Sequence, residues 1–212
     1  MKAVDIITAL ASFAVVVGFL TITPGVDTAL VLRTSLLAGR GSAWGVVLGI
    51  QAGTLTWGVL SAAGVSAVLA ASRLAYDVLR WAGAAYLIWM GARMLWESRR
   101  AAGAAQEAAG PAAGGFLSGF RRGVVTNLLN PKVGVFYVAM IPQFMPEGVP
   151  HAVMGLLLAG VHVCEGLLWS LLLVGFTALL RGWLSRPAVR RGLDQLTGLV
   201  VVGFGLRLAV QD

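Results

Sequence analysis

Long hydrophobic stretches alternate with short polar links along this chain of 212 residues. The hydrocarbon core of a membrane is about 30 Å thick, so a helix that crosses it needs about 20 hydrophobic residues. The pattern therefore predicts an all-α, polytopic integral membrane protein with six transmembrane helices. The predicted spans are Ile6 to Leu32, Ala43 to Ala71, Leu74 to Leu95, Phe120 to Phe144, Ala152 to Leu180 and Val189 to Val210.

Two of the predicted spans, the first and the fourth, are interrupted by a proline beside a charged residue. The interruptions read TPGVD at residues 23–27 and NLLNPK at residues 127–132. Lipid offers no water to the backbone groups that a break sets free, so breaks survive only where protein or an aqueous cavity covers them. Paired interruptions in two halves indicate the substrate site of a transporter. Pro24, Gly25 and Pro131 are therefore predicted to line the transport path.

The distances along the chain place both breaks at a similar depth. Pro24 precedes Arg33 by nine residues, and Pro131 follows Arg121 by ten residues. At 1.5 Å per residue, each break lies roughly 15 Å from the end of its span, near the bilayer centre. One span runs inward and the other outward, as in an inverted repeat.

A segment rich in Ala and Gly, residues 97–116, is predicted to be a flexible cytoplasmic loop between two halves, residues 1–96 and 117–212. The chain is thus one transmembrane transporter domain, a 3+3 inverted repeat with broken helices one and four. Its two halves would move against each other. The sixth span fits the pattern least well, because Asp194 and Arg207 fall within it.

Composition agrees with this fold, since 58% of the residues are hydrophobic, 12% are charged, and the mean hydropathy is +0.84. Soluble domains carry about 25% charged residues. The net charge of +7 does not indicate nucleic-acid binding, because the arginines lie at helix ends without an aromatic-laced basic surface. The first, third and fifth links hold Arg33, Arg40, Arg99, Arg100, Arg121, Arg122, Arg181, Arg186, Arg190 and Arg191.

Lys and Arg mark the cytoplasmic links of a membrane protein. The link after the fourth span holds Glu147 and His151 but neither Lys nor Arg. The charges therefore predict that odd-numbered links are cytoplasmic and that both termini are extracytoplasmic. We expect the lipid bilayer of a prokaryotic inner membrane as the surroundings; a homo-oligomer is left open.

Asp27, just after the first break, is the leading candidate for binding a substrate ammonium or a proton. A carboxylate within a span costs about 2.5–3.5 kcal/mol on insertion scales, so it should face the protein interior. The structural alternative is that Asp27 is the N-cap of a restarting helix.

Lys132, just after the second break, could bind a substrate carboxylate or pair with Asp27. The alternative is a lysine whose ammonium snorkels to the membrane surface. Asn127 and Asn130 are candidates to satisfy the backbone carbonyls that Pro131 sets free.

His162 and Glu165 are three residues apart in the fifth span and therefore share a helix face. Such a pair indicates a proton relay or a cation site; the alternative is a hydrogen-bonded pair that seals a helix contact. Gln51 and Thr54 share a face of the second span and are weaker candidates for substrate binding. The single cysteine, Cys164, permits no intrachain disulfide.

Glycines repeat every four residues along the second span, at Gly41, Gly45, Gly49 and Gly53. Small residues at this spacing let another helix approach closely. We interpret the stripe as structural; the alternative is that it widens a permeation path.

Several motifs together resemble the lysine exporter and homoserine/threonine exporter family. They are TPGVDT at residues 23–28, GR at 39–40, GIQAG at 49–53, AGAAYL at 82–87, NPK at 130–132 and IPQF at 141–144. The resemblance covers essentially the whole chain and implies an inner-membrane carrier that expels amino acids in exchange for protons. Many members have a second proline and an asparagine where this chain has Val26 and Asp27, so a role for Asp27 is not inherited.

These observations predict a secondary active transporter that exports amino acids or close analogues by proton antiport. It would be neither an enzyme nor a cofactor-dependent or metal-binding protein. The alternative function is a divalent-cation exporter that uses Asp27, His162 and Glu165 as ligands. The lone cysteine argues against a membrane redox enzyme, and a non-transporting assembly subunit is a further alternative.

Overall fold

The structure, a computed structural model, describes residues 5–71, 73–100, 115–146, 148–184 and 186–210. Most of the predicted loop, residues 101–114, therefore lies outside the described residues. Within them every regular element is a helix, which confirms the all-α prediction. The elements are α1 (Ile6–Ile22), α2 (Val26–Leu37), α3 (Gly39–Ala71), α4 (Arg73–Arg100), α5 (Phe116–Leu128), α6 (Pro131–Met140), the 3₁₀ turn η1 (Ile141–Phe144), α7 (His151–Gly175), α8 (Thr177–Leu184) and α9 (Pro187–Val210).

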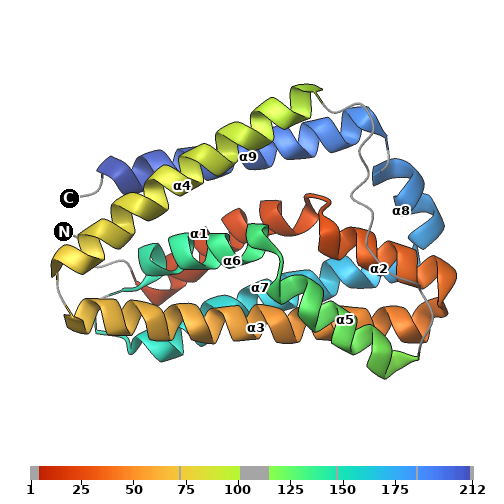
Figure 1. The fold of residues 1–212 in the computed structure, drawn as a ribbon, viewed down its shortest axis with the longest axis horizontal. Coiled ribbons are helices and arrows are strands. Elements are labelled where there is room, and N and C mark those ends of the chain that lie inside the picture. The colour runs from red at the N-terminus through yellow and green to blue at the C-terminus, as the bar shows by residue number, and fades with distance from the viewer. Residues whose placement is uncertain (1–4, 72, 101–114, 147, 185, 211–212) are drawn as a thin grey trace.

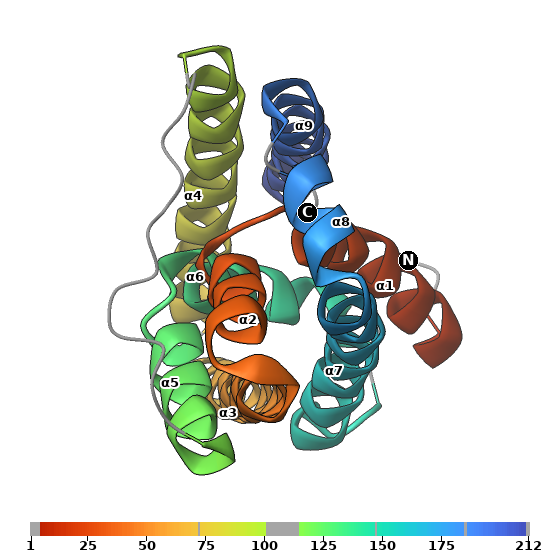
Figure 2. The same cartoon turned by 90° about the vertical axis from the view of Figure 1, so that its right-hand side faces the viewer.

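The helices form an elongated bundle whose long axis most of them follow (Figure 1). The pair α4 and α9 runs along one side, and α3, α5 and α7 run along the opposite side, with α1, α2 and α6 between them (Figures 1 and 2). The beginning of α1 and the end of α9 lie at the same end of the long axis (Figure 1).

Both predicted breaks are confirmed, and each is a sharp bend. The α1–α2 pair bends by 52°, and the pair formed by α5 and the segment from Lys132 to Phe144 bends by 55°. Proline explains the position of each bend, because it has no amide hydrogen and clashes with the preceding turn. After the second break, Asn130 restarts the helix as N-cap, and its side chain accepts a hydrogen bond from the backbone N–H of Lys132. Pro131 follows at the start of α6, where a missing N–H costs nothing.

The six-span prediction is only partly supported. Gly39–Gly64 of α3 and His151–Gly175 of α7 are each long and apolar enough to cross a membrane, and the two bent pairs raise the number to four among the described residues. Within the same residues, α4 and α9 are not among these candidate spans. The fifth predicted span also ends earlier than expected, because the chain turns at Phe176 between α7 and α8.

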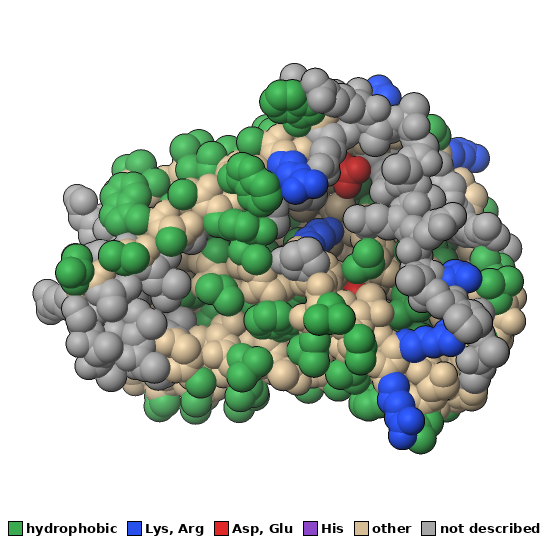
Figure 3. All heavy atoms as spheres, in the orientation of Figure 1, with side chains coloured by type: hydrophobic (Ala, Val, Ile, Leu, Met, Phe, Trp, Pro, Cys, Tyr) green, Lys and Arg blue, Asp and Glu red, His purple; other side chains and the backbone are tan. Residues whose placement is uncertain are grey.

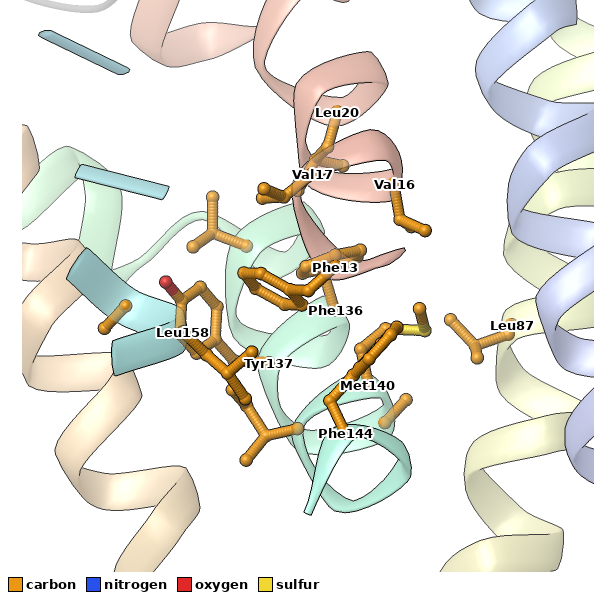
Figure 4. Packing of buried hydrophobic residues seen from close by; sticks show 14 of the residues in the cluster. Phe13, Val16, Val17, Leu20, Leu87, Phe136, Tyr137, Met140, Phe144 and Leu158 are labelled. Atoms are coloured by element: carbon orange, nitrogen blue, oxygen red, sulfur yellow. The ribbon is translucent and has the colours of Figure 1, made fainter. Parts of the chain in front are cut away.

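The larger hydrophobic core holds the first broken helix against the second. Phe13 of α1 packs edge-on against Phe144 of η1, with ring centroids 5.3 Å apart, and against Phe136 of α6 at 6.1 Å (Figure 4). Leu87 of α4 and Leu158 of α7 complete this cluster from two other sides. Side-chain packing thus fixes the two broken helices against each other.

The predicted glycine stripe is confirmed as a close helix contact at Gly45 and Gly49, whereas a Cβ on Gly41 would meet no atom within 4 Å. A Cβ placed on Gly45 would lie 2.1 Å from the carbonyl oxygen of Phe116, and one on Gly49 would lie 2.1 Å from that of Phe120. The contact is reciprocal, because a Cβ on Gly119 or Gly123 of α5 would lie 2.3 or 2.2 Å from carbonyl oxygens of α3. Helices α3 and α5 therefore touch backbone to backbone.

Charge is distributed unevenly along the long axis. Most Lys and Arg side chains visible in Figure 3 lie in its right-hand half, over the end formed by α2, α5 and α8, and hydrophobic side chains dominate the left and centre. The side chains of Arg99, Arg100, Arg181 and Arg190, and residue Glu147, lie outside what the structure describes.

We expect alanine substitutions along the glycine stripe to have opposite effects at two positions. Gly49→Ala forces a methyl group into the Phe120 backbone and should lower the free energy of unfolding by about 1–3 kcal/mol. Gly41→Ala meets no atom within 4 Å and should leave stability unchanged or raise it by up to about 1 kcal/mol. Thermal unfolding of the purified variants in detergent tests this, and equal effects at both positions would contradict it.

Candidate functional site

The two breaks meet at one cavity of about 70 Å³. One water occupies roughly 15–30 Å³, so this volume holds a few water molecules. Most of the predicted site residues line the cavity, namely Gly25, Asp27, Gln51, Thr54, Asn127, Asn130, Lys132 and His162. Glu165 and Pro24 are not among the lining residues, and Pro131 is described only as the first residue of α6. The structure thus brings together residues that are more than a hundred positions apart in sequence.

Asp27 lies in the first turn of α2, where the positive end of the helix dipole favours a carboxylate. It is not the N-cap, because Gly25 occupies that position without any side-chain bond. Its Oδ2 accepts a hydrogen bond of 2.9 Å from Nδ2 of Asn127. Its Oδ1 is buried and has no hydrogen-bond partner among the described residues. One carboxylate oxygen is therefore held in place while the other is available to a ligand.

Lys132 fills the backbone position that Pro24 leaves unsatisfied. In an unbroken helix the carbonyl of Leu20 would accept the N–H of residue 24, which proline lacks. The ammonium of Lys132 donates to the carbonyls of Leu20 and Thr23 instead, at 3.3 Å each. A cation here also opposes the negative end of the α1 dipole.

The predicted ion pair between Lys132 and Asp27 does not form among the residues that the structure describes, and the alternative of a snorkelling lysine is wrong as well. The reason is the same for both: the carbonyls at the end of α1 hold the ammonium inside the protein.

The second break repeats this arrangement with a different donor. The carbonyl of Asn127 stands four residues before Pro131 and loses its helical partner in the same way. It accepts a bond of 3.4 Å from Nε1 of Trp57 on α3 and a bond of 3.1 Å from the backbone N–H of Asn130. At each break, a side chain from a distant part of the chain replaces the missing amide.

The predicted pair of His162 and Glu165 is also not formed in the described part of the chain. Nδ1 of His162 lies 3.0 Å from the hydroxyl of Tyr137, and the two rings stack with centroids 5.7 Å apart. Glu165 instead faces α1, where its Oε2 would lie 3.4 Å from a Cβ placed on Gly18. That oxygen is buried and has no hydrogen-bond partner among the described residues. The two side chains diverge because they contact different helices.

Trp169, which was not predicted, lines the cavity beside Gln51 on the α3–α7 side. Its indole Nε1 is buried without a hydrogen-bond partner in the described residues. The side chain of Gln51 packs against Gly166, because a Cβ placed on Gly166 would lie 2.8 Å from both Nε2 and Oε1 of Gln51. The signal for Trp169 in the sequence was its spacing of four residues, about one helical turn, from Glu165.

Helix α9 also reaches the first break, which was not predicted. The hydroxyls of Thr23 and Thr197 are hydrogen-bonded to each other, and Thr197 donates to the carbonyl of Phe19 at 3.2 Å. Asp194, one turn earlier on α9, acts electrostatically on Lys132. The signal in the sequence was the i, i+3 spacing of these two polar residues, which places them on one face of α9.

A metal site finds no support. No group of three or more His, Cys, Asp or Glu side chains comes together in the part of the chain that the structure describes. Of the proposed ligands, Asp27 and His162 line the cavity and Glu165 does not.

We expect the two replacement donors to differ in their importance for stability. Lys132→Met removes the bonds to both the Leu20 and Thr23 carbonyls and should lower the free energy of unfolding by about 1–3 kcal/mol. Trp57→Phe should lower the free energy of unfolding by about 1 kcal/mol or less, because the Asn127 carbonyl still accepts a hydrogen bond from the N–H of Asn130. Unfolding of the purified variants measures both. Full stability of Lys132→Met would mean that the lysine does not hold the break.

Comparison with known proteins agrees with this architecture. The family model described as "LysE type translocator" matches residues 18–212. The chain is 28% identical over 203 residues to the uncharacterized membrane protein YrhP of Bacillus subtilis, covering 93% of this chain and 97% of the relative.

Two further relatives have names that state a function. The homoserine/homoserine lactone efflux protein of Salmonella typhimurium is 31% identical, and the leucine efflux protein of Klebsiella pneumoniae is 29% identical, each over 90% of both chains. No solved structure matches the chain. The match over residues 18–212 establishes that this membrane protein belongs to the LysE type translocator family.

Proposed function

We propose that the protein is a secondary active transporter that exports amino acids or close analogues from the cytoplasm. The observation that carries this proposal is a buried carboxylate oxygen of Asp27, which lacks a hydrogen-bond partner among the described residues and lies in the cavity where the two broken helices meet. The family and the two named efflux relatives support export of small amino compounds as the activity.

Asp27 and Asn127 form the proposed ammonium-binding site. Every amino acid carries an α-ammonium group with three N–H donors, and Oδ1 of Asp27 is an acceptor that lacks a donor among the described residues. Asn127 holds the other carboxylate oxygen, so the acceptor is oriented before the substrate arrives. Charge-assisted hydrogen bonds of this kind are among the stronger ones in proteins.

A cavity of about 70 Å³ suits a few water molecules rather than most amino acids. We interpret this arrangement as a closed state that opens when the surrounding helices separate. The bends of 52° and 55° in corresponding segments support a 3+3 inverted repeat with six spans, in which α4 and α9 also cross the membrane. The shared end of α1 and α9 supports termini on one side (Figure 1).

The charge distribution supports an orientation for this repeat. Arg33, Arg40, Arg121 and Arg122 belong to α2, α3 and α5, near the end of the molecule where basic side chains gather (Figure 3). By the rule that cytoplasmic links carry Lys and Arg, this end faces the cytoplasm and both termini are extracytoplasmic.

Glu165 is the proposed coupling residue for proton antiport. It lies outside the cavity, between α7 and Gly18 of α1, and one of its oxygens is buried without a partner among the described residues. A carboxylate in a span is costly unless it is paired or protonated. Protonation of Glu165 would therefore stabilise this packing of α7 on α1. The proton gradient would then change the stability of this conformation through Glu165.

We expect Asp27→Asn to reduce export at least about tenfold, because it removes the charge that holds the substrate ammonium. The assay is efflux of labelled amino acids from cells, at equal abundance of the protein in the membrane. The matched control is Asp5→Asn, which makes the same change at an exposed helix N-cap where asparagine serves equally well. Unchanged efflux in Asp27→Asn would remove the proposed ammonium site.

Glu165→Gln should separate binding from coupling. In proteoliposomes, the variant should exchange substrate for substrate at about the wild-type rate but should not accumulate it in response to a pH gradient. The reason is that glutamine cannot carry a proton across the membrane, whereas the cavity residues remain unchanged. Loss of both activities, with the variant still folded, would assign Glu165 to substrate binding or structure instead.

A further inference from the structure

Three buried side-chain atoms of cavity-lining residues lack hydrogen-bond partners among the described residues. Two are acceptors, Oδ1 of Asp27 and Oδ1 of Asn127, and one is a donor, Nε1 of Trp169. Oδ1 of Asp27 can only accept a hydrogen bond when the carboxyl group is ionised, and Nε1 of Trp169 can only donate one. Both residues line the same cavity, Asp27 from α2 and Trp169 from α7. Buried polar atoms are nearly always paired, so each of these atoms requires a partner.

We propose that the indole N–H of Trp169, together with the amide of Gln51, binds the carboxyl group of the amino acid whose ammonium binds Asp27. This inference rests on the proposed function and names the second half of its substrate site. A zwitterion offers the two kinds of group that the cavity lacks, because its ammonium donates and its carboxylate accepts. An amine without a carboxyl group would satisfy Asp27 alone.

Gln51 is placed to assist Trp169. Its side chain lies against Gly166, three residues before Trp169 on α7, and any larger residue at 166 would displace it. Gln51 of α3 and Trp169 of α7 both line the cavity, and Gln51 contacts α7 at Gly166. The glutamine amide can donate to a carboxylate through Nε2.

Two other lining side chains that could take this role, Lys132 and His162, make hydrogen bonds elsewhere. The hydrogen bonds of Lys132 go to the carbonyls of Leu20 and Thr23. His162 directs Nδ1 to the hydroxyl of Tyr137. A neutral donor such as an indole N–H also binds the carbonyl oxygen of an ester or lactone. The indole N–H and the Gln51 amide would therefore bind either the carboxylate of an amino acid or the carbonyl oxygen of its ester.

The experiment compares two substrates in proteoliposomes that contain the full-length protein. The first is whichever of the twenty natural amino acids the wild-type protein transports fastest, and the second is the amine formed by its decarboxylation. Trp169→Phe should raise KM for the amino acid about tenfold, because it removes one hydrogen bond to a charged group, and should leave KM for the amine unchanged. Trp44→Phe is the matched control, since Trp44 packs in the α2–α3 core outside the cavity lining.

A second variant keeps the test independent of the tryptophan. Gln51→Glu places a negative charge beside the proposed carboxyl position, so it should weaken transport of the amino acid and strengthen that of the cationic amine.

Two results in Trp169→Phe overturn the inference. An equal rise of KM for both substrates would show that the indole only packs. No change of KM for either substrate would show that water alone satisfies its N–H. A wild-type protein that transports none of the twenty amino acids overturns the proposed function itself, and this inference with it.

Discussion

The missing amide hydrogen of proline is the constraint around which this molecule is arranged. Pro24 and Pro131 each leave a carbonyl without its helical partner, on Leu20 and on Asn127. Water cannot reach such groups from a lipid core, so the protein must supply the donors. Lys132 supplies one of them from α6, directly after the second break, and Trp57 supplies another from α3. Each kink is therefore held by a part of the chain that folds elsewhere, which fixes the two kinks relative to each other.

This constraint also explains how two opposite charges can lie near one cavity without an ion pair. The ammonium of Lys132 is opposed by the carbonyl end of α1, and the carboxylate of Asp27 lies near the amide end of α2. Helix ends, rather than the other side chain, compensate each charge. One oxygen of Asp27 remains available as a result, and a direct ion pair would have occupied it.

The sequence was sufficient to predict the breaks, because a proline beside a charged residue cannot continue a helix that lies unprotected in lipid. It also predicted that Asp27, Asn127 and Lys132 would face one site, since a charge in a span avoids lipid. It could not give their partners. Lys132 was expected to bind a substrate carboxylate or to pair with Asp27, whereas it donates to the backbone carbonyls of Leu20 and Thr23, which a residue pattern does not display.

The limits of sequence reasoning are similar for the other residues. His162 and Glu165 share a helix face, but the neighbours that separate them, Tyr137 and Gly18, come from helices whose placement depends on tertiary packing. The sequence alone does not distinguish Trp169 from other membrane tryptophans. Its buried N–H and its place in the cavity lining are visible only in the structure. Local patterns locate polar groups, and only the assembled fold shows which of them lack partners.

The glycine contacts restrict how this bundle can change shape. Helix α3 meets α5 backbone to backbone, and α4 meets α9 in the same manner, since a Cβ on Gly91 would lie 2.6 Å from the carbonyl oxygen of Gly198. Each pair joins a helix of the predicted first half to one of the second. A movement of the two halves as separate blocks would therefore break both contacts, whereas a shift of the α4–α9 pair relative to the α3–α5 pair would keep them.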